Sequence, residues 1–142
     1  MKKYHHIKKI KLQQYPIILV IAISNDYNKM VEEKIVHESV IADIDSSFAY
    51  TFFDGKIDGL YSVVILLHLW KDSLCIDLED LVHETNHAGN RILQYIEAKP
   101  DLLNDEQESY LKSWIAGEIQ SVMVENNITF KLFKSKCTKE GD

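Results

Sequence analysis

The chain has little of several things that would place it in a special class of protein. Its 142 residues include 2 cysteines, 2 prolines and 5 glycines, which excludes a disulfide-rich scaffold, a collagen-like chain and a low-complexity linker. No run of about 18 apolar residues occurs, so no segment is long enough to cross a membrane as a helix. Because 46% of the residues are hydrophobic and 27% are charged, we expect a single globular domain over residues 1–142.

The two cysteines are far apart and fit no C-x-x-C pattern. We therefore expect Cys75 and Cys137 to be reduced thiols of a cytoplasmic protein, with one disulfide as the alternative. The apolar run over residues 17–24 follows a lysine-rich start and so imitates a secretory signal. We favour a buried strand for this run, because its length also suits a strand covered on both faces, and keep secretion as the minority alternative.

Positive charge is concentrated at the two ends of the chain. The formal net charge is −6, but residues 13–130 carry 7 basic and 20 acidic side chains, a net of −13. We interpret residues 1–14 and 131–142 as basic tails in solvent. An acidic body repels phosphates and attracts cations, so nucleic acid is not an expected partner.

Hydrophobic periodicity predicts the α+β class. The expected elements are strands over residues 17–23, 48–53 and 60–70, and helices over 27–37, 78–97 and 104–125, in the order β-α-β-β-α-α. Turns of the Asp-Gly type predict that the second and third strands form an antiparallel hairpin. The prediction is a small three-stranded sheet, mixed or antiparallel, packed on a central helix over 78–97 and on a second long helix. The third strand is expected to offer a free edge.

Within the central helix stands HETNH, residues 83–87, which is an HExxH motif. Apolar residues at helical spacing place the core-facing side of this helix roughly opposite His87, with His83 about 40° away from His87. Two histidines four residues apart on a helix can bind one ion at about 2.0–2.1 Å. The spacing predicts that His83 and His87 bind a metal, most suitably zinc, and that Glu84 is the general base.

A catalytic zinc site needs a third protein ligand, and the second long helix offers three carboxylates. Glu106, Glu108 and Glu118 are the candidates. Straight antiparallel helices would set His87 opposite a residue nearer 114 than 106, which favours Glu118. Steeply crossing helices would remove that objection to Glu106.

The stretch EQESY, residues 106–110, resembles the ExxxD element of thermolysin-like gluzincin peptidases, in which the glutamate is the third zinc ligand. The resemblance implies that Glu106 is that ligand. Tyr110 stands where the gluzincin pattern has an aspartate that orients a metal-binding histidine. We expect this tyrosine instead to be catalytic, donating a hydrogen bond to the oxyanion.

Residues 17–120 are similar to a family of small phage and prophage proteins regarded as metallopeptidases. The shared features are a strand, the HExxH helix, a Lys-Pro-Asp connector and the element DEQESYL, which has Ser109 where alanine is usual. This resemblance implies the same fold and the same metal site. It also implies the host cytoplasm as the location if the chain is encoded by a phage.

The pattern as a whole predicts a zinc-dependent metallopeptidase. A metal-bound water would attack a peptide bond of a peptide or protein substrate, with Glu84 as general base. The alternative is a non-catalytic, metal-stabilised phage accessory protein that binds a host or phage partner. Arg91, the only arginine, follows His87 by one turn, and we expect it to pair with a surface acid rather than with a substrate carboxylate.

Overall fold

Four strands form the central sheet of the computed structural model, in the order β1-β2-β4-β3. The structure describes residues 3–13, 15–38, 49–57, 59–69, 74–99, 101, 103 and 105–131. The strands are β1 His5–Lys11, β2 Ile17–Ser24, β3 Ala49–Ile57, β4 Leu60–His68, β5 Cys75–Asp77 and β6 Thr129–Lys131, and the helices are α1 Tyr27–Glu32, α3 Leu78–Tyr95 and α4 Glu106–Glu125. This is the expected α+β class, with the predicted strands and helices in the predicted order.

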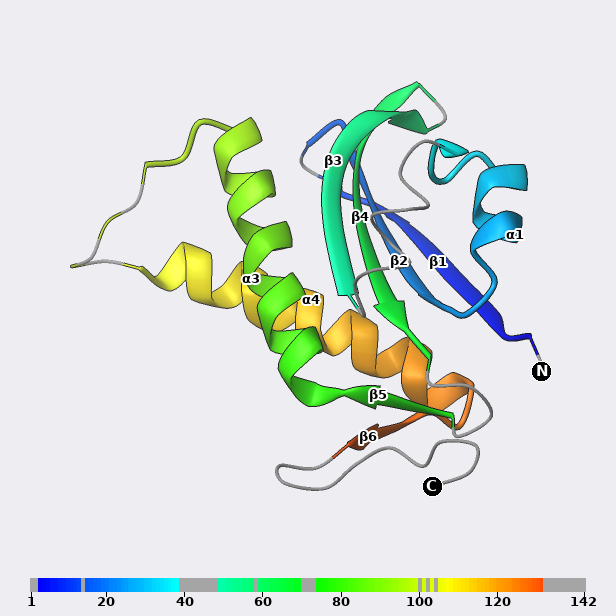
Figure 1. Cartoon of the computed structure of the whole chain (residues 1–142). Helices are drawn as coiled ribbons and strands as arrows, with labels where there is room; N and C mark the ends of the chain where they lie inside the picture. The colour runs from blue at the N-terminus through cyan, green and yellow to red at the C-terminus, as the bar shows by residue number, and fades with distance from the viewer. Residues whose placement is uncertain are drawn as a thin grey trace.

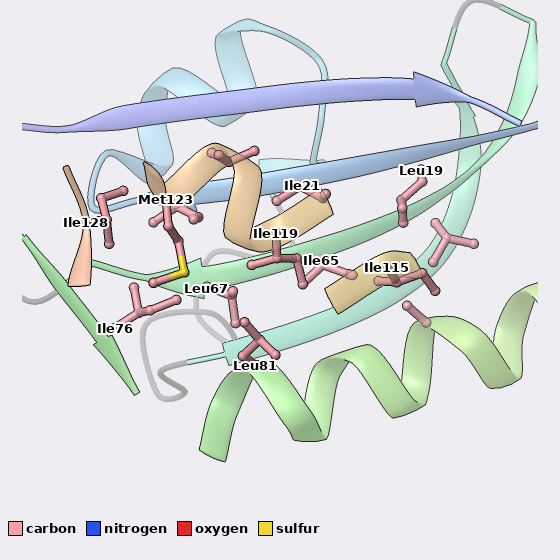
Figure 2. Packing of buried hydrophobic residues seen from close by; sticks show 14 of the residues in the cluster. Leu19, Ile21, Ile65, Leu67, Ile76, Leu81, Ile115, Ile119, Met123 and Ile128 are labelled. Carbon is pink, nitrogen blue, oxygen red and sulfur yellow. The ribbon is translucent and has the colours of Figure 1, made fainter. Parts of the chain in front are cut away.

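The centre of the sheet is made by β2 and β4, which run parallel to each other. Every residue of β2 is buried, as the continuous apolar run predicts. Helices α3 and α4 cover one face of the sheet and α1 covers the other (Figure 1). Figure 2 shows the larger core, in which Leu19, Ile21, Ile65 and Leu67 of the sheet pack against residues of the two long helices.

The sheet is mixed, as expected, but it has four strands and not three. Residues His5–Lys11, predicted as part of a basic tail, form β1, which pairs antiparallel with β2. The prediction failed because HHIKKIK has few apolar residues. Lysines are a common feature of edge strands, where they discourage pairing with another chain.

The free edge beside α3 belongs to β3 and not to β4. Strand β4 pairs with β2 on one side and, as the predicted hairpin, antiparallel with β3 on the other. The expectation that the third predicted strand is an edge is therefore wrong. Within the described residues, β3 pairs only with β4.

A second sheet joins two three-residue strands, β5 and β6, in parallel. Strands this short give no periodic signal, so the sequence did not predict them. Lys131 of the expected C-terminal tail belongs to β6, and residues 132–142 lie outside the described part. Cys75 is disulfide-bonded, so the expectation of reduced thiols is wrong. No helix among the described residues is long and apolar enough to cross a membrane.

The long helices begin close to their predicted positions at residues 78 and 104. Asp77 precedes α3 and Asp105 precedes α4. Asp26 caps α1 by accepting a hydrogen bond from the backbone N–H of Lys29. In Figure 1, α4 crosses behind α3 at a steep angle, so the two helices are not the straight antiparallel pair that favours Glu118.

Candidate metal centre

Helix α3 turns one side to the sheet and the opposite side to solvent. Leu81, Ala88 and Ile92 are buried in the core. His83 and His87 are exposed on the far side, as the helical phase of the sequence predicts. The histidine pair is therefore open to an ion from solution.

The two imidazoles are close enough to share one ion. Their Nε2 atoms lie 3.0 Å apart, and the ring planes meet at 76°. Two nitrogens bound at about 2.0–2.1 Å to a tetrahedral zinc would lie roughly 3.3–3.4 Å apart. The pair therefore fits zinc after a movement of a few tenths of an ångström. Without metal, the same distance suits a hydrogen bond between the rings.

Glu84 completes a group of three possible ligands. Its carboxylate and the two imidazoles place their ligand atoms within 4.8 Å of one another, which makes this the group in the described residues that can hold a metal ion. Unlike the histidines, Glu84 is buried, with 4% of its surface exposed. A buried carboxylate requires a hydrogen-bond donor to offset the loss of water.

Thr51 on β3 supplies that donor. Its hydroxyl donates to Glu84 Oε2 at 2.7 Å and also lies 3.3 Å from the backbone oxygen of Glu84. Sequence reasoning did not identify Thr51, because the two residues are 33 positions apart and on different elements. No motif in the sequence signals this contact.

The three carboxylates considered as a third ligand lie in different surroundings on α4, and none of them belongs to the group formed by His83, Glu84 and His87. Glu106 is exposed at the first position of the helix. Glu108 pairs with Lys112, and Glu118 pairs with Lys8 of β1 at 2.9 Å. Among the three, Glu106 is the one without an ion pair in the described part of the chain. The structure does not test which of them binds metal.

A lysine from α4 lies over α3 beside the histidine pair. Lys112 Nζ donates to Asn86 Oδ1 at 2.7 Å and pairs with Glu108. Gly89 permits this approach, since a Cβ atom there would stand 2.7 Å from Lys112 Cγ. Close helix packing therefore explains this helical glycine.

Tyr110 lies on the solvent side of α4. Its surface is 72% exposed. The side of α4 that faces the core carries Ile115, Ile119 and Val122, which are buried, while Trp114 is only partly covered. The catalytic role predicted for Tyr110 stays a prediction.

Within the described residues, Arg91 forms no ion pair, so the expected surface pair is not seen there. Its Nη1 lies 3.5 Å from Gln94 Oε1, and no carboxylate of the described residues is within 4.0 Å of its guanidinium. On α3, the positions three and four residues away are His87, Ala88, Gln94 and Tyr95, none of them acidic. The helix therefore provides no acid at pairing distance.

Comparisons with known proteins give no family assignment. No protein-family model, curated protein or solved structure matches this chain. The residues and their geometry are therefore the basis for inferring a function.

Proposed function

We propose that this chain is a zinc-dependent peptidase of a minimal gluzincin-like type. The proposal depends on three features that occur together. Helix α3 carries an exposed histidine pair and an adjacent buried carboxylate, and β3 supplies a hydrogen-bond donor to that carboxylate. Two satisfied surface histidines would need no buried glutamate beside them.

Each residue has a part in the proposed reaction. His83 and His87 would hold the ion, which would act as a Lewis acid and make a water molecule easier to deprotonate. Glu84 accepts a proton from the attacking water and returns it to the leaving amine. Thr51 occupies one lone pair of Glu84 Oε2 and leaves Oε1 free for this transfer.

Glu106 is the proposed third ligand, as the EQESY element implies. Glu106 has no ion pair within the described part of the chain, which supports the assignment, because Glu108 and Glu118 would first have to leave a lysine. Its position at the start of α4 requires the first turn of that helix to move toward the histidines. The proposed role of Tyr110 on the same turn depends on the same movement.

Strand β3 is the proposed substrate-binding edge. It is the edge of the sheet beside α3, and Thr51 connects it directly to Glu84. An extended peptide can add to such an edge by main-chain hydrogen bonds. That pairing would align a peptide bond along the exposed face of α3.

A second function is favoured by the open surroundings of the histidines. Cavities of about 480 and 390 Å³ are present, but neither is lined by His83, Glu84 or His87. Small-molecule sites are usually concave. This observation favours a protein whose metal stabilises a binding surface for a host or phage partner.

A conservative change at Glu84 tests the peptidase directly. Glu84→Gln should keep one zinc per chain and lose hydrolysis of a quenched fluorescent peptide library, because an amide cannot accept the proton. Equal hydrolysis by both proteins would contradict the mechanism. A zinc-loaded wild type without hydrolysis would favour the binding protein.

Three matched changes test the third ligand. Glu106→Gln should weaken zinc binding at least tenfold in a chelator competition, while Glu108→Gln and Glu118→Gln should not. All three variants remove one negative charge from α4, so they share the general electrostatic effect. A loss confined to Glu108→Gln or Glu118→Gln would move the assignment to that residue.

A further inference from the structure

Arg91 lies on the same exposed side of α3 as the proposed metal site. Arg91 follows Glu84 by seven positions in the sequence. At about 100° per residue this is within roughly 20° of two full turns, so the two residues lie at nearly the same angle around the helix. Glu84 faces Thr51 of β3, so Arg91 lies on the β3 side of the helix. This is the side on which an extended substrate would run.

The guanidinium of Arg91 is available to a ligand. It is exposed, its contact with Gln94 is long, and the described residues give it no ion pair. An arginine presents five donors in a planar fork, which matches a carboxylate in bidentate geometry.

We propose that Arg91 binds a carboxylate of the substrate. The inference rests on the peptidase function proposed above and names its substrate class: a peptide with a negative charge close to the bond that is cleaved. Arg91 follows His87 by about 6 Å along the helix axis and Glu84 by about 10 Å. An extended peptide advances about 3.3 Å per residue, so the carboxylate lies one to three residues from the cleaved bond.

Two kinds of peptide carry such a carboxylate. A free C-terminus would make the protein a carboxypeptidase-like enzyme, and an aspartate or glutamate side chain would make it selective for acidic peptides. The guanidinium would recognise both by the same pair of hydrogen bonds. Arg91 is thus a specificity-determining residue and takes no part in proton transfer.

The single arginine allows a direct test by nuclear magnetic resonance. The Nε–Hε signal of Arg91 is the only arginine signal of the chain, so its shift reports binding without ambiguity. The protein, zinc-loaded and metal-free, would be titrated with acetylated tetra-alanine bearing a free C-terminus. Parallel titrations would use the amidated peptide and an amidated peptide with one internal glutamate.

The signal should shift saturably with a peptide that carries a carboxylate and not with the neutral amide. The charged peptide that binds more tightly shows whether the carboxylate belongs to a free C-terminus or to an acidic side chain. By calorimetry, Arg91→Gln should raise the Kd of that peptide at least tenfold, and Arg91→Lys should recover part of the loss. Lys9→Gln, which removes an exposed charge from the opposite edge strand, should leave the Kd unchanged.

Absence of a shift with both charged peptides, or an unchanged Kd in Arg91→Gln, would overturn the proposal. Zinc content measured on the same samples separates the two claims. Zinc binding without a shift would remove the role of Arg91 and leave the metal site. A shift in a protein that binds no zinc would keep the carboxylate site and remove the peptidase.

Discussion

Glu84 is the only ionisable side chain among the described residues that are buried. Its carboxylate accepts a hydrogen bond from Thr51, and hydrogen bonds to charged groups contribute about 1.5–3 kcal/mol. This contact connects the edge strand to the proposed general base. The position of β3 therefore determines how the carboxylate is oriented.

Substitutions at Thr51 should show this dependence. Thr51→Val keeps the shape of the side chain and removes the donor, so it should lower the free energy of unfolding by about 1–3 kcal/mol. Thr51→Ser keeps the hydroxyl and should lose less than half as much. Urea unfolding of the metal-free proteins measures both. Equal losses in the two variants would show that the hydroxyl is unimportant.

His6 should make stability depend on pH. Burial, with a smaller effect from the neighbouring His5, lowers the pKa of His6 below its usual 6.5. Its Nε2 atom is buried and has no hydrogen-bond partner among the described residues. The unfolded chain therefore binds a proton more readily than the folded one, and stability from this residue is lost as pH falls below about 6.5.

The test compares the metal-free wild type with His6→Leu between pH 7.5 and 5.5. The variant should lose less unfolding free energy over this interval, while His37→Gln, an exposed histidine, should behave as the wild type does. Identical pH dependence in wild type and His6→Leu would contradict the assignment.

At the residue level, helical periodicity correctly predicted the features that depend on one helix alone. The exposure of His83 and His87 follows from their position relative to Leu81, Ala88 and Ile92. The contact between Thr51 and Glu84 depends on how β3 and α3 pack, so the sequence contained no local signal for it. The 72% exposure of Tyr110 likewise depends on how α4 packs on the rest of the chain.

At the level of elements, two helical glycines have opposite surroundings. A methyl group on Gly89 would meet Lys112, whereas one on Gly117 would meet no atom within 4 Å. Alanine is favoured over glycine in a helix by about 1 kcal/mol, and overpacking costs about 1–3 kcal/mol. The effect of an alanine at Gly89 on stability should therefore depend on the contact between α3 and α4.

Gly117→Ala should raise the free energy of unfolding by up to about 1 kcal/mol. Gly89→Ala should leave it unchanged or lower it, because Lys112 must give up its place over α3. Chemical denaturation of both variants supplies the comparison. If Gly89→Ala raised the free energy of unfolding as much as Gly117→Ala, the two helices would not be closely packed there.

The elements that were predicted are those with a strong apolar pattern, such as β2 and α3. Strand β1 was missed because its burial is partial and its residues include three lysines. Strands β5 and β6 were missed because three residues show no period, and their pairing joins segments over 50 positions apart. Pairing between distant segments arises only in the folded chain and leaves no pattern in a short stretch of sequence.

At the scale of the whole molecule, the sheet is covered on both faces and α3 keeps one side in solvent. The His83, Glu84 and His87 group that could hold a metal lies next to β3, an edge strand of the sheet, and the body of the chain is strongly acidic. Such a surface attracts cations and suits metal binding. Whether the ion binds is the claim on which the proposed function depends.

Metal content tests that claim most directly. The purified full chain, supplied with zinc and then desalted, would be measured by inductively coupled plasma mass spectrometry beside His87→Ala. We expect about one zinc per chain in the wild type and a loss of that zinc in the variant. Absence of zinc from the wild type, or equal zinc in both proteins, would contradict it.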